Sequence, residues 1–232
     1  MNTFLKDLQT SLVSKRPELA AQTAVQITAL RHLKPDSLEA LVRIVEEDVF
    51  PAKTRAAACW LLAQAHYGRA SAALWKVFSG KDRDLLWESA KALAVLKTRS
   101  VVPKLISSLK SKSIEHRSAA AYTLGMMREA RAITYLEAML ADKHESSTVR
   151  GHAAEALAYL KKRRSFAVLL SALKDPQAEV RWWAAFALGE LGDKRALPEL
   201  KRVALVDKGK ARNGFSVRVE ARRAYDRLSK HG

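Results

Sequence analysis

Few side chains in the sequence are spaced for metal binding or for nucleophilic catalysis. The six histidines never pair at the i, i+4 spacing that places two metal ligands on one helix face, and a single cysteine cannot build a thiolate metal site. There is one His-Glu pair, at His144-Glu145, and no glycine-rich loop that could cradle a phosphate. These observations predict no metal, no cofactor and no catalytic residues, and they favour a protein that is not an enzyme.

Basic side chains form a recurring pattern that suits the binding of a polyanion. Lys and Arg outnumber Asp and Glu by 41 to 24, which gives a formal net charge of +17. One interpretation is that a row of cations on a rigid fold attracts an acidic partner. The alternative is that these cations only keep the turns solvated. The recurring cations are Arg69, Lys97, Arg99, Arg128, Arg131, Lys161, Lys162, Arg163, Arg164, Lys194 and Arg195.

The same period runs through the apolar residues and identifies the elements that carry the cations. The segment Val180–Leu191 has counterparts that begin near residues 54, 85, 116 and 149, and the pattern restarts at Val217. Its apolar positions fall on one helix face at 100° per residue, and a second helix follows with Leu197 and Leu200. Neither helix can bury its apolar face alone, so the repeats must stack. We therefore predict an all-α fold, a right-handed superhelix of about six helical hairpins.

The repeats predict one domain that extends over residues 1–232. A weak N-terminal unit covers residues 1–50, clear repeats cover 51–206, and a half repeat covers 217–232. The loop 207–216 lengthens the step between repeats to 37 residues. It contains two glycines, several basic residues and Phe215, so we expect either a contact element or a tolerated surface insertion.

The repeat sequence V-R-x-x-A-A-x-A-L-G-x-L-G-D, followed by A-L-P-x-L, resembles the HEAT-like repeats first named from phycobilisome lyases. The best match is Val180–Leu200, and the resemblance extends over nearly the whole chain. It implies a helical solenoid. It does not specify one function, because such repeats serve scaffolds, adaptors, lyase subunits and enzymes alike.

A repeated arginine follows the first buried position of most repeats. Because it recurs with the packing register, we interpret it as a structural ladder, in which each guanidinium binds an acid or a carbonyl near the neighbouring turn. Asp175 is one candidate partner. Cys59 shares the column of Ala185, which indicates a buried and inert thiol. The arginines of the column are Arg55, Arg117, Arg150, Arg181 and Arg218.

Aromatic residues form a second candidate contact surface. Trp182 and Phe186 lie about 200° and 240° around their helix from Val180, opposite its buried face. Trp87 shares the Trp182 column. Such a stripe could anchor a partner, because aromatic residues are enriched at binding hot spots. The alternative is that this face packs against the adjacent repeat.

Together these patterns predict a non-enzymatic HEAT-like scaffold or adaptor that recognises an acidic protein segment through basic turns and aromatic anchors. Nucleic-acid binding through the same cations is the first alternative, and a HEAT-like DNA glycosylase or a phycobilin-lyase-type subunit is the second. The N-terminal segment lacks a signal-peptide core, and no apolar run reaches the roughly 20 residues that span a bilayer. We therefore expect a cytoplasmic protein without a membrane-spanning segment.

Overall fold

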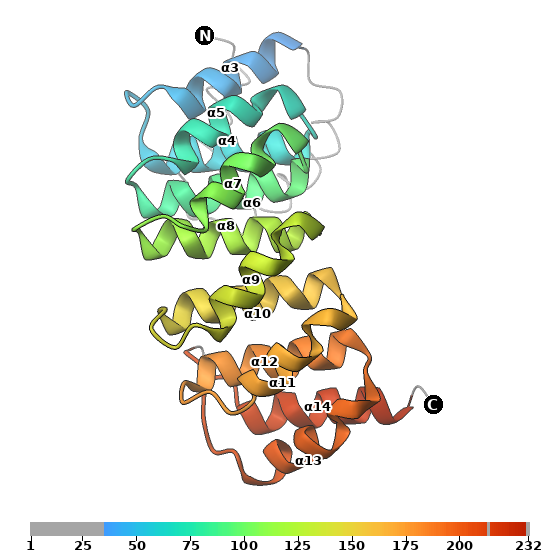
Figure 1. Cartoon of the computed structure of the whole chain (residues 1–232). Helices are drawn as coiled ribbons and strands as arrows, with labels where there is room; N and C mark the ends of the chain where they lie inside the picture. Colours follow the sequence, from blue (N-terminus) through green and yellow to red (C-terminus); the bar gives the residue numbers. More distant parts are fainter. Residues whose placement is uncertain (1–34, 213, 231–232) are drawn as a thin grey trace, which may run out of the picture. The chain divides into compact units, whose positions relative to one another are not determined.

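The computed structural model describes residues 35–212 and 214–230 of the chain. These residues form α-helices joined by short turns, several of which contain one turn of 3-10 helix (Figure 1). The only strand-like pairing among them is an isolated bridge between Lys210 and Ser216. The predicted all-α repeat fold is therefore confirmed. Residues 1–34, which belong to the predicted weak first unit, lie outside the described residues.

The chain divides into two compact units, residues 1–101 and 102–232. The described helices of unit 1 are α3 (Pro35–Glu46), α4 (Ala52–Gln64), α5 (Ser71–Phe78) and α6 (Arg83–Leu96). Within this unit α3 packs on α4, α5 packs on α6, and α4 lies against α6. Leu62 and Leu93 are fully buried between these helices, as the apolar periodicity of the sequence predicts.

Unit 2 is built in the same way from more helices. The even-numbered helices form one layer, in which each helix lies against the next. The odd-numbered helices form a second layer that covers the first (Figure 1). The helices are α7 (Val102–Ser108), α8 (Ile114–Met126), α9 (Ile133–Ala141), α10 (Ser147–Leu160), α11 (Phe166–Ala172), α12 (Ala178–Leu191), α13 (Leu197–Val206) and α14 (Val217–Lys230).

Small residues let the even-numbered helices of unit 2 approach closely. A Cβ atom added to Gly125 of α8 would lie 2.5 Å from the Cα atom of Ala156 in α10. A Cβ atom added to Gly189 of α12 would lie 2.9 Å from the Cβ atom of Ala224 in α14. Both distances are shorter than any ordinary carbon contact, so a larger side chain would push the helices apart.

The helices pair differently from the repeat units that the sequence suggests. The sequence template begins with an even-numbered helix and ends with the odd-numbered helix that follows it. In the structure, each odd-numbered helix packs on the even-numbered helix that follows it, as α9 does on α10 and α11 on α12. The period of a helix–turn–helix–turn sequence does not show at which turn a hairpin begins. The cation-rich turns therefore lie between hairpins rather than inside them.

Each of these turns has a left-handed residue one or two positions after the end of an even-numbered helix. The residues with positive φ at this position are His66, Lys97, Arg128, Lys161 and Gly192. Only the last is a glycine, although glycine adopts this conformation at the lowest cost. Four of the five positions thus hold a long or bulky side chain on a strained backbone.

Among residues 35–212 and 214–230, no helix combines the length and the apolar character needed to cross a membrane.

Candidate partner-binding surfaces

The repeated arginines lie near the turns that connect the two helices of each hairpin. Their guanidinium groups hydrogen-bond to the turn of their own hairpin and to the equivalent turn of the next hairpin. The Nε and Nη2 atoms of Arg117 each donate to a carboxylate oxygen of Glu145, both at 2.7 Å. Its Nη1 atom donates to the carbonyl of Ser111, also at 2.7 Å. Arg181 repeats this geometry with Asp207, at 2.6 and 3.0 Å, and with the carbonyl of Asp175.

Arg150 makes the most buried link of this kind. Its Nη2 atom donates to Asp175 at 2.8 Å, and its Nη1 atom donates to the carbonyl of Glu145 at 2.6 Å. Lys143 donates to the second oxygen of Asp175 at 2.7 Å. Burial by itself would raise the pKa of the Asp175 carboxyl, but the hydrogen bonds from Lys143, a backbone amide and Arg150 outweigh burial and lower this pKa.

The two ends of the arginine column differ from its middle. In unit 1, Arg55 donates to the carbonyl of Val45 and pairs with Asp48. In unit 2, Arg218 on the last helix is exposed and has no carboxylate partner among the described residues. Along the middle of the column, every guanidinium is thus neutralised by a carboxylate of a neighbouring turn.

Cys59, the other candidate of the core columns, is fully buried in α4. Its burial, together with the nearby Glu88 carboxylate, raises the pKa of the thiol to about 12. A thiol with this pKa is a poor nucleophile at neutral pH. No cluster of three or more potential metal ligands lies in the described part of the chain.

The cation-rich turns lie at the opposite ends of the helices from the arginine column, and neighbouring turns touch each other. In unit 1 the hydroxyls of Ser71 and Thr98 hydrogen-bond at 2.6 Å and join two successive turns. In unit 2 the guanidinium of Arg195 lies 4.3 Å from the ring centre of Phe166, which follows the preceding turn. We call these segments the basic turns; they are residues 66–70 and 97–101 in unit 1 and 127–132, 161–165 and 192–196 in unit 2.

Four of the predicted site cations on the basic turns are neutralised by carboxylates. Arg131 and Arg195 pair with the acid two residues before them, Glu129 and Asp193. Lys161 pairs with Glu190 of α12 at 2.7 Å, and Arg164 pairs with Glu137 of α9 at 2.7 Å. The acid-x-Arg spacing of the first two pairs is visible in the sequence and was a signal for their neutralisation.

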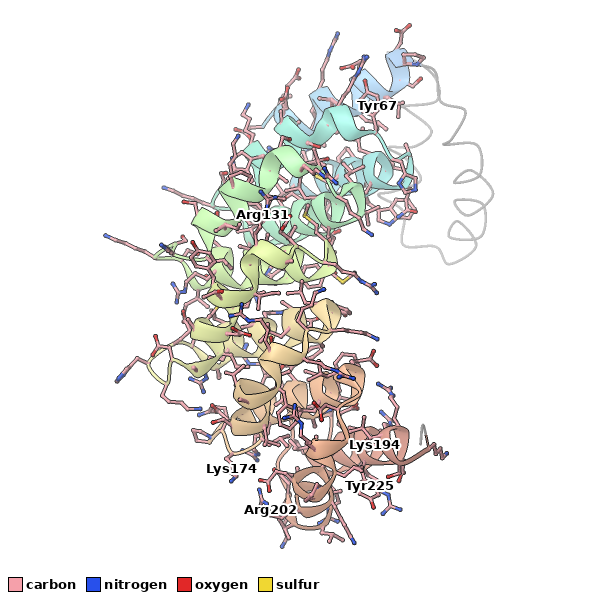
Figure 2. The ribbon with its side chains drawn as sticks, turned by 45° about the vertical axis from the view of Figure 1, so that its right-hand side comes forward. Tyr67, Arg131, Lys174, Lys194, Arg202 and Tyr225 are labelled. Atoms are coloured by element: carbon pink, nitrogen blue, oxygen red, sulfur yellow. The ribbon has the colours of Figure 1, made fainter. Side chains whose placement is uncertain are left out.

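The remaining cations are exposed. Arg69 is exposed near the hydroxyl of Tyr67, which itself donates to the carboxylate of Glu39. Figure 2 shows two basic turns of unit 2, one with Arg131, which pairs with Glu129, and one with Lys194, which has no ion pair among the described residues. The exposed turn cations with no ion pair among the described residues are Lys97, Arg99, Arg128, Lys162, Arg163 and Lys194.

Two basic turns of unit 2 border a hollow of about 310 Å³ between the ends of α10, α12 and α14. Lys161, Lys194 and Arg227 line it, together with the carboxylate of Glu190. Burial would raise the pKa of Glu190, but its pairs with Lys161 and Arg227 lower the pKa instead. Three cations therefore face one carboxylate in the hollow, which leaves an excess of positive charge.

The predicted aromatic residues are half-buried rather than fully exposed or fully packed. In α12 the rings of Trp182 and Phe186 stack with centres 6.0 Å apart, and Trp183 lies edge-on to both. The ring of Phe215, from the loop before α14, stacks on Trp182. Trp87 is half-buried in unit 1 and does not belong to this cluster.

A polar cluster on α10 was not predicted from the sequence. His152 Nδ1 lies 2.9 Å from a carboxylate oxygen of Glu155, and the hydroxyl of Tyr159 donates to the other oxygen at 3.4 Å. Burial, followed by the charge of Glu155, raises the pKa of Tyr159 to about 12. The i, i+3, i+7 spacing of these residues on one helix face was the available signal. Glu155 is almost fully buried and satisfied by its own helix, which indicates a structural role.

Solved structures of similar fold are helical repeat proteins. An engineered protein is 21% identical with a TM-score of 0.52, over 84% of this chain and 98% of that chain. The complex of CpcE and CpcF of phycocyanin lyase from Nostoc sp. PCC7120 gives 20% identity and a TM-score of 0.52, over 94% of this chain and 92% of that one. Kap95p, solved in a complex with RanGDP, gives 13% identity and a TM-score of 0.71; this chain covers 33% of Kap95p. At these identities the likeness shows the fold alone.

Sequence comparison agrees with the fold. No curated protein sequence matches the chain significantly. The family model of HEAT repeats matches twice, over residues 72–148 and 140–214, which together make up more than half of the chain. The chain therefore belongs to the HEAT-repeat family.

Proposed function

We propose that this protein is a scaffold that binds an acidic segment of a protein partner with its basic turns. The observation that carries the proposal is the contrast between the two sets of turns. Inside the hairpins, carboxylates neutralise the repeated arginines at 2.6 to 3.0 Å. On the basic turns, Lys162, Arg163 and Lys194 stay exposed with no ion pair among the described residues. The acids inside the hairpins thus bind the repeated arginines, whereas the two acids of the basic turns in unit 2, Glu129 and Asp193, pair with Arg131 and Arg195 and leave other turn cations without an ion pair.

The backbone of the basic turns supports the same proposal. Lys97, Arg128 and Lys161 occupy left-handed positions at which glycine would relieve strain. A cation directly after a helix also interacts favourably with the negative end of the helix dipole, which offsets part of the strain. The cations are held on short turns of fixed geometry, so a partner does not have to order a flexible loop before binding.

Acidic residues of a partner would be attracted to these turns over a distance of about one Debye length, roughly 8–10 Å at physiological salt. The hollow beside Lys194 offers one place where a carboxylate could meet several cations. Aromatic residues on α12 would add apolar contacts after the first electrostatic encounter.

The proposal is tested with a short labelled polyglutamate peptide and the full chain. In the first variant, Lys162, Arg163 and Lys194 are all changed to Gln. Each exposed charge pair contributes up to about 1 kcal/mol, so we expect this variant to bind the peptide about tenfold more weakly at low salt. The affinity is measured by fluorescence anisotropy, and circular dichroism verifies that the helices are retained.

A matched variant changes Arg131, Arg164 and Arg195 to Gln and removes the same formal charge. Because these three cations already pair with carboxylates, we expect a much smaller loss of affinity. Equal losses in both variants would show that only net charge matters, and the proposed site would be wrong. A random-sequence DNA duplex tests the alternative ligand: tighter binding of the duplex than of the peptide, with a steep salt dependence, would favour nucleic acid.

A further inference from the structure

Three aromatic rings at the C-terminal end of unit 2 form a continuous stack. Phe215 lies on Trp182 with ring centres 5.7 Å apart and planes 26° apart. Trp182 lies on Phe186 at 6.0 Å, with planes 3° apart. The two inner rings are half-buried, whereas Phe215 is 55% exposed. The stack therefore ends in an aromatic ring that is open to solvent.

The backbone around Phe215 is fixed by hydrogen bonds. The amide of Ala211 donates to the carbonyl of Phe215 at 2.8 Å, and the amide of Val217 donates to the carbonyl of Gly209 at 3.1 Å. The amide of Arg212 donates to the carboxylate of Glu179 in α12, also at 2.8 Å. The ring is thus held in place before any ligand arrives, which lowers the entropy cost of binding.

The charge around this ring is positive. Lys208, Lys210, Arg212 and Arg218 are exposed and make no ion pair with the described residues. The one acid of the same segment, Asp207, accepts hydrogen bonds from Arg181. Glu179 of α12 adds one carboxylate beside the backbone of Arg212. The four exposed cations of the loop and of the first turn of α14 therefore outnumber the acids near the exposed end of the aromatic stack.

We infer that this end of unit 2 binds single-stranded nucleic acid, with a base stacked on Phe215 and phosphates bound by the neighbouring cations. Proteins that bind single-stranded nucleic acid combine exposed aromatic rings with Lys and Arg side chains. The rings stack on the bases, and the cations bind the phosphates. A duplex keeps its bases stacked on each other and cannot offer one to Phe215. A polyglutamate segment would use the cations but has no flat group to stack on the ring. We call Phe215, Lys210 and Arg212 the terminal stacking site.

The test uses the full chain and a labelled oligouridylate. Replacing Phe215 with Leu keeps an apolar side chain but removes the stacking face. We expect Phe215→Leu to weaken oligouridylate binding by about tenfold or more, the loss of one stacked base. Tyr135→Leu is the matched control, because it removes another exposed aromatic ring of unit 2; its affinity should equal that of the unmodified chain.

A second variant separates charge from stacking. Changing Lys210 and Arg212 to Gln should lower the slope of log affinity against log salt by about 1.4, since each phosphate contact on a single strand contributes about 0.7. Phe215→Leu should leave this slope unchanged. The variant at Lys162, Arg163 and Lys194 should retain oligouridylate binding, so the terminal stacking site and the basic turns can fail independently.

Several results would overturn the inference. They are absence of oligouridylate binding at low salt, equal affinity of Phe215→Leu and the unmodified chain, and binding of duplex DNA with the same dependence on Phe215. Binding of polyglutamate that is weakened by Phe215→Leu would also overturn it, because the site would then accept an acidic peptide.

Discussion

Arg150 and Arg218 occupy the same column of the repeat, but only Arg150 is buried. Its side chain is 4% exposed and its partner Asp175 is fully enclosed. Arg218 lies on the last helix, and no turn of a further hairpin is present among the described residues to supply a carboxylate. The same residue type thus has a structural role in one repeat and is available to a ligand in another. What decides between the two roles is whether a carboxylate faces the guanidinium.

This difference predicts unequal effects of one substitution at the two positions. Arg150→Met leaves the buried Asp175 with fewer hydrogen bonds, so we expect it to lower the free energy of unfolding by at least about 2 kcal/mol. Arg218→Met, the matched control, should change it by less than about 0.5 kcal/mol. Urea unfolding followed by circular dichroism measures both. Similar values for the two variants would mean that the arginine column does not join the turns.

The helices follow from the sequence more directly than the sites do. Val180, Ala184 and Leu188 are buried as their spacing predicts, because one apolar face per helix is enough to fix the stack. The spacing did not predict that Phe215 would lie on Trp182, since that contact depends on the path of a loop that breaks the period. Neutralisation of Lys161 by Glu190 was equally out of reach, because Lys161 lies on the turn after α10 and Glu190 lies on α12.

At the scale of the element, the left-handed turn residues link stability to binding. Arg128→Gly should remove backbone strain and raise the free energy of unfolding by about 0.5–1 kcal/mol. The same change removes an exposed cation and should weaken binding of the polyglutamate peptide. Lys162→Gly is the control: Lys162 has a φ of −98°, so glycine offers no relief there. We expect that variant to lose both stability and affinity. Loss of stability in Arg128→Gly would contradict this account of the turns.

At the scale of the whole molecule, charge is distributed by position in the repeat. The formal net charge of +17 does not by itself define a binding surface. Carboxylates occupy the turns inside the hairpins of unit 2, where they bind the repeated arginines. Uncompensated cations remain on the basic turns and near Phe215. The basic turns therefore carry exposed positive charge at the ends of the helices opposite the arginine column, and in unit 2 the loop before α14 adds further exposed cations at the same end as that column.

Lysine footprinting tests the role of the basic turns most directly. The full chain is acetylated with and without the polyglutamate peptide, and the modification of each lysine is measured by mass spectrometry. Lys97, Lys162 and Lys194 should lose reactivity when the peptide is bound, whereas the exposed Lys174 and Lys201, which lie outside the basic turns, should keep it. Uniform protection of all five lysines, or protection confined to Lys174 and Lys201, would contradict the proposal that the basic turns bind the acidic partner.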